Sequence, residues 1–214
     1  MLRLNSYRPL RLTKFGLEVA RKYCLDPFID GSIRREPDFE NEYPSITGLC
    51  RLNKFAPTLR IGDSIAYITV KGKYGLMEPH WRLVGILTVI EKFTSVESHN
   101  EAFKWYESRG ISIPKNCMAF GNPGADFEKS SQQMDHPTVQ RKGADAWEAE
   151  YRMRSVIAPA FVITKIERLD LKNPPVLLSD DMRRIFDRIP GTQNPPYISE
   201  EQLSMLRHEF DKRT

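Results

Sequence analysis

The chain has 214 residues, of which 40% are hydrophobic and 28% charged, a balance that is typical of globular domains and excludes fibrous and intrinsically disordered proteins. No apolar run approaches the roughly 20 residues that a membrane-spanning helix needs, and the first residues lack the apolar block of a signal peptide. The net charge of +4 is too small to indicate a nucleic-acid partner by itself. We expect one cytoplasmic domain over residues 1–214, with no membrane partner and a helical extension over about residues 176–214.

The first part of the chain predicts a strand, a helix and a long loop. Residues 1–12 alternate weakly between apolar and polar, and Thr13 can cap a helix over residues 14–24. Residues 26–48 contain three prolines, two glycines and many charges, which predicts a loop. A loop of that length inside a compact domain is more often functional than incidental.

The middle of the chain predicts a β-hairpin. A Gly62-Asp63 turn leads into a strand over residues 64–70, which is rich in β-branched and aromatic residues. A second, longer strand covers residues 81–92. Gly85 lies inside it, and a glycine there indicates a bulge, a bend of a barrel, or the close approach of a ligand or another backbone.

The last part of the chain predicts alternating helices and strands. Ser98 and Glu101 form a capping-box pattern at the start of a helix. Ser179 and Ser199 each precede a short C-terminal helix as expected N-caps. Between these helices we expect a short strand over residues 117–120, a loop over 121–143, a helix over 144–154 and a strand from residue 160.

This order favours an α+β fold: a small, partly open antiparallel β-barrel flanked by helices. A doubly wound parallel sheet would need more helical crossovers than the chain offers. The sequence has no GxGxxG, P-loop or GxSxG motif, and its cysteines and histidines form no CxxC or HExxH pattern. We therefore predict no cofactor and no metal site.

The basic residues are concentrated in two segments. Residues 1–35 carry a charge of +5 and residues 51–73 a charge of +4, whereas residues 36–50 carry −4. Attraction to phosphate follows local Lys and Arg density, so the first third of the chain is the best candidate for contact with an anionic partner. Solvated side chains on amphipathic elements remain the alternative.

Two motifs carry a resemblance to a known superfamily. Residues 59–67 (LRIGDSIAY), followed by residues 83–89 (LVGILTV), resemble the central pattern of PUA-like β-barrels, which include the ASCH, EVE and YTH domains. Residues 50–63 (CRLNKFAPTLRIGD) are similar to the nucleotide-modification-associated domains grouped with that fold. The resemblance implies a PUA-like fold and a module that captures a modified or flipped base of DNA or RNA without catalysis.

Capture of one base requires rings that stack on it, polar groups that read its edge, and cations for the flanking phosphates. The chain supplies candidates for each role. The base-binding candidates are Tyr67, Thr69, Tyr74, Trp81, Ser32, Thr47 and Asn122. The phosphate-binding candidates are Arg34, Arg35, Arg51, Lys54, Lys71 and Lys73.

Several of these candidates also have a structural interpretation. Trp81 is in phase with Leu83 and Leu87 along the strand, which equally predicts core packing. The same question is open for Tyr67. Arg34 and Arg35 precede four acidic residues and can pair with them, and Asn122 precedes Pro-Gly as a turn residue does.

Two other functions stay open. ASCH-type amidohydrolases resemble this chain in size and use a lysine, a threonine and a carboxylate, which would make Lys54, Thr47 and Glu36 catalytic residues acting on a modified nucleoside. No motif of those enzymes is matched residue by residue. The third candidate is a protein-interaction module whose long loops carry the partner surface.

Overall fold

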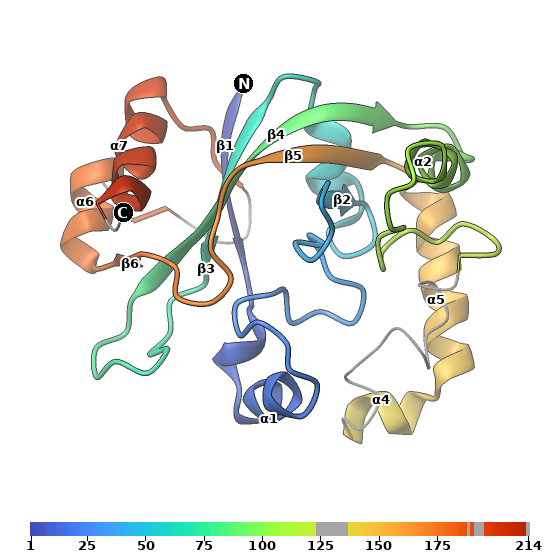
Figure 1. The fold of residues 1–214 in the computed structure, drawn as a ribbon, viewed down its shortest axis with the longest axis horizontal. Coiled ribbons are helices and arrows are strands. Elements are labelled where there is room, and N and C mark those ends of the chain that lie inside the picture. The colour runs from blue at the N-terminus through green and yellow to red at the C-terminus, as the bar shows by residue number, and fades with distance from the viewer. Residues whose placement is uncertain (123–136, 188, 191–194, 213–214) are drawn as a thin grey trace.

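The structure, a computed structural model, describes residues 1–122, 137–187, 189–190 and 195–212. A six-stranded sheet has the order β1-β3-β4-β5-β2, and β6 pairs with β4. The strands are β1 (Leu2–Tyr7), β2 (Ser45–Thr47), β3 (Ser64–Thr69), β4 (Trp81–Phe93), β5 (Phe161–Leu169) and β6 (Val176–Leu177). The long strand β4 curves across the molecule, so that the sheet has the curled form of a half-barrel (Figure 1).

Helices lie around this sheet (Figure 1). They are α1 (Lys14–Lys22), α2 (Ser98–Glu107), α4 (Pro137–Lys142), α5 (Ala144–Ile157), α6 (Ser179–Phe186) and α7 (Glu200–Asp211), with short 3-10 helices η1 (Leu10–Leu12), η2 (Leu52–Lys54) and η3 (Ala56–Thr58). The predicted α+β class with a partly open barrel is thus confirmed. None of the helices in the described ranges is long and apolar enough to cross a membrane.

The sheet is mixed, whereas the sequence predicted an antiparallel one. Strand β1 pairs in parallel with β3, from Leu2 opposite Ser64 to Tyr7 opposite Thr69. Residues 8–63 form the connection, and a connection of a dozen or more residues is what a parallel pair requires. The long loop is therefore part of the chain segment that connects two neighbouring strands, and it lies beside the end of β1.

The Gly62-Asp63 turn and its hairpin have the predicted form. Gly62 has a φ of +88°, which glycine adopts readily, and Asp63 Oδ2 accepts a hydrogen bond of 2.8 Å from the backbone N–H of Arg60. The β3–β4 register shifts beside Gly85. A Cβ on Gly85 would lie 3.2 Å from the carbonyl oxygen of Arg168 in β5, which together with the register shift confirms the predicted bulge and the close approach of another backbone.

Two of the three predicted serine caps are wrong. Ser98 is the first residue of α2, and its hydroxyl donates to the carbonyl oxygen of Pro159 in place of capping the helix. Ser179 is likewise the first residue of α6. Ser199 does cap α7, in a capping box with Gln202, as predicted.

Two predictions between α2 and β5 also differ from the structure. Residues 117–120 form no strand, because the backbone N–H of Met118 donates to His99 Nδ1 of α2, at 3.0 Å. The expected loop over residues 121–143 contains helix α4. Its residues 123–136 lie outside the described residues.

Apolar side chains pack on both faces of the sheet. The Tyr67 face, as we call it, includes Ile65, Tyr67, Val84 and Leu87. The Trp81 face includes Ala66, Ile68, Trp81 and Leu83, and is covered by Met182 and Phe186 of α6 and Leu203 and Leu206 of α7. The bulge beside Gly85 places Leu83 and Leu87 on opposite faces, so the shared phase predicted from the sequence is broken there.

Candidate functional site

A pocket of about 590 Å³ opens beside the end of β1. Its walls come from residues 5–16, from residues 30–36 of the long loop and from residues 50–51, and its size is typical of a ligand site. The polar residues that line it are Asn5, Ser6, Arg8, Thr13, Asp30, Ser32, Glu36, Cys50 and Arg51. The rings of Tyr7 and Phe15 lie among its apolar walls.

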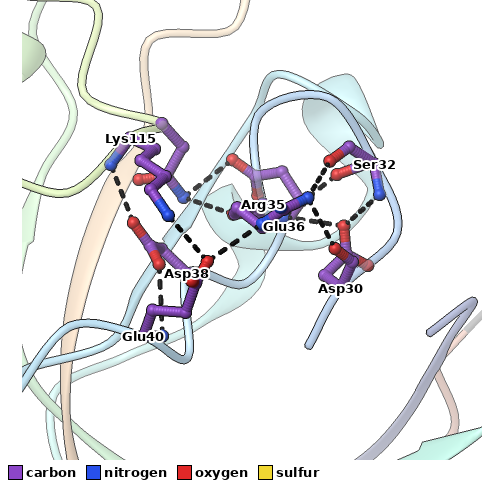
Figure 2. Close-up of polar contacts among 8 residues, drawn as sticks. Asp30, Ser32, Arg35, Glu36, Asp38, Glu40 and Lys115 are labelled. Carbon is purple, nitrogen blue, oxygen red and sulfur yellow. Dashed lines mark hydrogen bonds and ion pairs between the residues drawn. The ribbon is translucent and has the colours of Figure 1, made fainter. Parts of the chain in front are cut away.

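Asp30 shapes the part of the long loop that lines the pocket. Its Oδ1 accepts hydrogen bonds from the backbone N–H groups of Ser32, at 2.8 Å, and Glu36, at 3.1 Å (Figure 2). The guanidinium of Arg35 donates to the carbonyl oxygens of Asp30 and Ser32, both at 3.0 Å. Residues 30–36 are therefore closed into a compact turn that presents two carboxyl groups to the pocket.

A second set of contacts fixes the loop from behind (Figure 2). Glu40 pairs with Arg35 Nε at 3.0 Å and with Lys115 Nζ at 2.9 Å. Asp38 Oδ2 accepts from the backbone N–H of Lys115 at 2.7 Å. These bonds tie the loop to the segment after α2 and hold the pocket wall in place.

Glu36 is held by three donors. Its carboxylate accepts from the backbone N–H of Thr47 at 2.9 Å, from the Thr47 hydroxyl, and from Asn116 Nδ2 at 3.1 Å. These bonds favour the ionised form, but burial outweighs them and raises the pKa of Glu36 to about 8. Burial also raises the pKa of Asp30, to about 6. Near neutral pH Glu36 is therefore largely protonated and Asp30 largely ionised.

Asn5, a residue of the pocket wall, lies beside a second buried polar side chain, that of Tyr67. Asn5 is paired in register with Tyr67 of β3, so both side chains lie on the same face of the sheet. Asn5 is 5% exposed and Tyr67 is 0% exposed. The Tyr67 hydroxyl lies within hydrogen-bonding reach of the Asn5 side chain, and neither Asn5 Oδ1 nor this hydroxyl makes a hydrogen bond of good geometry with another described residue. The two side chains thus form a buried polar pair behind the β1 wall of the pocket.

Cationic side chains line the pocket as well. Arg51 Nη2 donates to the carbonyl oxygen of Ser6 at 2.6 Å, which fixes residue 51 against β1. Arg8 is exposed at the same pocket. The hairpin loop before β4 packs next to this region, where Arg11 Nε donates to the carbonyl oxygen of Tyr74 at 3.3 Å. The two basic segments of the sequence thus meet near the pocket.

The structure does not bring the three predicted rings to one pocket. Tyr67 lies in the core of its own face, with its hydroxyl next to the Asn5 side chain. Tyr74 is buried, and its hydroxyl donates to the carbonyl oxygen of Val70 at 2.6 Å. Trp81 is 3% exposed and packs under α6 and α7. The aromatic walls of the observed pocket are Tyr7 and Phe15 instead.

The other predicted base-binding residues are dispersed. Ser32 lines the pocket, and Thr47 lies behind Glu36. Thr69 Oγ1 accepts from the backbone N–H of Arg82 at 3.0 Å. Asn122 is buried away from the pocket and donates to the carbonyl oxygen of Cys117 at 2.7 Å.

The predicted phosphate-binding residues divide into buried and exposed groups. Arg34 is buried with its guanidinium 5.4 Å from the centre of the Tyr151 ring, and Arg35 is buried in its pair with Glu40. Arg51 lines the pocket. The exposed members are Lys54, Lys71 and Lys73. Of the alternative catalytic set, Glu36 and Thr47 are in contact, whereas Lys54 is exposed on η2.

Sequence reasoning missed three residues that build this site: Asn5, Asp30 and Asn116. Asp30 precedes Gly-Ser, and an aspartate there often accepts backbone N–H groups two residues on, so this turn could have been predicted. Asn5 and Asn116 carry no such local signal. Their roles depend on strand pairing and on a contact between distant segments.

Comparisons with known proteins assign no family: no family model matches the chain, and no similar curated protein or solved structure was found. Among the described residues, no group of three histidine, cysteine or acidic side chains is arranged to hold a metal ion. The chemistry of the pocket is therefore the basis for assigning a function.

Proposed function

We propose that this chain is a nucleic-acid-binding module that holds one base, modified or flipped out of a DNA or RNA strand, in the pocket beside β1. The observation that carries the proposal is that Asn5 and Asp30 are almost fully buried and yet line the pocket. The PUA-like assignment of the fold belongs to the same proposal, and the curled, partly open sheet is compatible with it.

The walls of the pocket suit a flat, polar-edged ligand. Tyr7, Leu10 and Phe15 provide apolar and aromatic surface, and base-to-ring stacking tolerates any base because every base has a π-face. Asn5 and Asp30 provide hydrogen-bonding groups, which fix the orientation of a bound molecule. A cavity of about 590 Å³ accommodates one base with its sugar.

The electrostatic surroundings suit a base that remains attached to phosphate. Arg8 and Arg51 line the pocket, and Lys54 is exposed close to Arg51 in sequence. Each phosphate contact made by such side chains releases counterions, so affinity for single strands falls as salt is raised.

Binding is tested by titrating short labelled single strands of DNA and RNA against matched strands without bases, at two salt concentrations. We expect strands with bases to bind more tightly, by about tenfold or more per captured base, since stacking on an aromatic side chain contributes about 1–3 kcal/mol. Asn5→Ala should remove most of this difference, whereas Asn53→Ala on exposed η2 should leave it unchanged. Equal affinity for both kinds of strand would overturn the proposal.

The contact between Thr47 and Glu36 favours a second candidate, hydrolysis of an acylated or otherwise modified nucleoside. Because the pKa of Glu36 is about 8, only its minor ionised fraction near neutral pH can accept a proton from water, and this activity should therefore rise with pH up to about 8. This function predicts release of the acyl group from an N-acylated nucleoside and loss of turnover in Thr47→Ala. A panel of such nucleosides that stays intact with the protein would exclude it.

A further inference from the structure

We propose that helix α5 is the contact surface of a homodimer, in which it packs in antiparallel orientation on α5 of a second copy of this chain. Figure 1 shows α5 at the outer edge of the molecule, on the side opposite to α6 and α7. The inference does not depend on the proposed function, because the residues that line the pocket all come from other parts of the chain.

Helix α5 carries apolar side chains on two opposite faces. On the inner face, Tyr151 is 4% exposed and packs with Leu49 and Met118. The outer face carries the exposed apolar residues Ala146, Ala149, Met153, Val156 and Ile157. At 3.6 residues per turn these five lie within an arc of about 100°, which is the width of a helix face that packs against another element. The outer face of α5 is therefore a second packing surface, which the single chain leaves uncovered.

The exposed residues have the spacing of a seam between two helices. Ala146, Ala149, Met153 and Val156 follow one another at intervals of three, four and three residues. In an antiparallel pair centred on residue 151, Ala149 faces Met153 of the partner subunit. Ala146 likewise faces Val156 of the partner subunit. Each layer of the seam then joins a small side chain to a larger one, so that the two surfaces fill the space between them without crowding.

The charges beside the seam make α5 complementary to a second copy of itself. Its N-terminal half carries Glu148 and Glu150, and its C-terminal half carries Arg152 and Arg154. Glu148 and Arg152 pair on one flank of the seam, and Glu150 and Arg154 pair on the other. A two-fold axis between antiparallel helices sets each flank against the same flank of the partner in reverse, so each glutamate comes close to an arginine.

A parallel pair in the same register would instead set each of these charges opposite its own copy. It would also align the two helix dipoles, which the antiparallel pair opposes. The interface is nevertheless small, because a standard interface buries about 1,600 Å² and the face of a single helix covers less. We therefore expect a reversible dimer that forms at about micromolar concentrations or above.

Sedimentation velocity of the whole chain, between about 1 and 500 μM, tests for this dimer. Met153→Glu should raise the dissociation constant by about tenfold or more, because the dimer would bury a carboxylate at the centre of the seam. Ala149→Glu, at the facing position, should act alike. Both positions are exposed in the single chain, so both variants should fold normally. Met77→Glu is the matched control, since it makes the same change at a side chain that is 92% exposed before β4.

The control should leave the dissociation constant unchanged. A chain that stays monomeric throughout this range would overturn the inference. A dimer that Met153→Glu and Ala149→Glu do not weaken, or that Met77→Glu weakens equally, would place the contact on another surface and overturn it as well.

The orientation is tested by disulfide cross-linking, with the exposed Cys24 and Cys50 replaced by serine. One preparation carries Ala149→Cys and a second, of different mass through a tag, carries Met153→Cys. Mild oxidation of the mixture should give mainly the mixed disulfide, because a disulfide requires Cα atoms within about 7 Å of each other. Linkage of each variant mainly to itself would indicate a parallel pair, and no linkage in a dimeric sample would place the contact elsewhere; either result would overturn the antiparallel dimer.

Discussion

The two faces of the curled sheet differ in how completely they satisfy their buried side chains. On the Trp81 face, helices α6 and α7 cover Trp81, Leu83 and Ile86 with apolar residues. On the Tyr67 face, the core adjoins a pocket that is lined by buried polar and ionisable side chains, among them Asn5, Asp30 and Glu36. One face serves stability, whereas the other keeps polar groups away from water without full compensation.

The titratable groups of the pocket also pay for their burial without full compensation. Burial raises the pKa of Asp30 and of Glu36, which means that the fold disfavours their ionised forms. Buried groups that oppose stability in this way cluster at functional sites, because selection for stability alone would replace them. The proposed function therefore belongs to the Tyr67 face, and the following predictions test this division.

The largest effect is expected on the Trp81 face. Trp81→Ala should lower the free energy of unfolding by about 3–5 kcal/mol, because it removes a large, almost fully buried ring from a packed core. Denaturant unfolding measures the loss. Among the molecules that remain folded, the difference in affinity between strands with and without bases should be unchanged. A lost preference for bases at intact stability would instead support the base-binding role that the sequence predicted for Trp81.

The second effect concerns a buried histidine outside the pocket. Burial lowers the pKa of His99 to about 4, and its Nδ1 accepts from the backbone N–H of Met118. The unfolded chain, with a pKa near 6.5, then binds the proton more readily, so stability is fully present above pH 6.5 and is lost as the pH falls towards 4. The loss should reach about 3 kcal/mol.

Unfolding curves measured between pH 7 and 4 test this prediction. His99→Asn keeps an oxygen near the position of Nδ1 and does not titrate in this range. The variant should be less stable overall, because the ring packs 5.1 Å from the Phe161 ring, centre to centre, but its stability should depend less on pH. An equally steep dependence in the variant would show that His99 is not the group responsible.

The pocket should have the opposite dependence on pH. Because the pKa of Asp30 is raised to about 6 from an ordinary value of 3.8, the unfolded chain loses this proton first as the pH rises. Asp30 therefore lowers stability progressively between about pH 4 and 6. Asp30→Asn should increase the free energy of unfolding by about 2 kcal/mol at pH 8 while weakening base binding. Asp180→Asn, which removes the same charge from an exposed side chain of α6, should do neither, and a less stable Asp30→Asn protein would contradict this account.

The sequence predicted those parts of the fold that depend on local patterns. The Gly62-Asp63 turn, both hairpin strands and the Ser199 cap each follow from residues close together in the chain, and each is confirmed. The mixed sheet was not predicted, because the parallel pairing of β1 with β3 joins residues more than sixty positions apart. Ser98 and Ser179 have the same local chemistry as Ser199 but do not cap their helices. For Ser98 the reason is a tertiary contact, because its hydroxyl donates to the carbonyl oxygen of Pro159.

The candidate site was less predictable than the fold. Ser32, Glu36 and Arg51 were singled out from the sequence and do line the pocket. Trp81 was a base-binding candidate because it flanks the hairpin, whereas its phase with Leu83 predicted core packing, and the structure buries both residues in the core of the same face. Asn5 is a single polar residue in a short strand, and only its pairing with Tyr67 reveals it.

The smallest predicted effect tests whether the two faces are independent. Ser199 Oγ accepts from the backbone N–H of Gln202 at the start of α7, and Ser199→Ala should lower the free energy of unfolding by about 1 kcal/mol. Ser204→Ala, at an exposed position inside the same helix, should have no such cost, because alanine is the better helix former. Since α7 covers only the Trp81 face, neither variant should change the preference for strands that carry bases. If Ser199→Ala weakened this preference and Ser204→Ala did not, the packing of α7 would be coupled to the pocket across the sheet, and the division between a stabilising face and a functional face would be wrong.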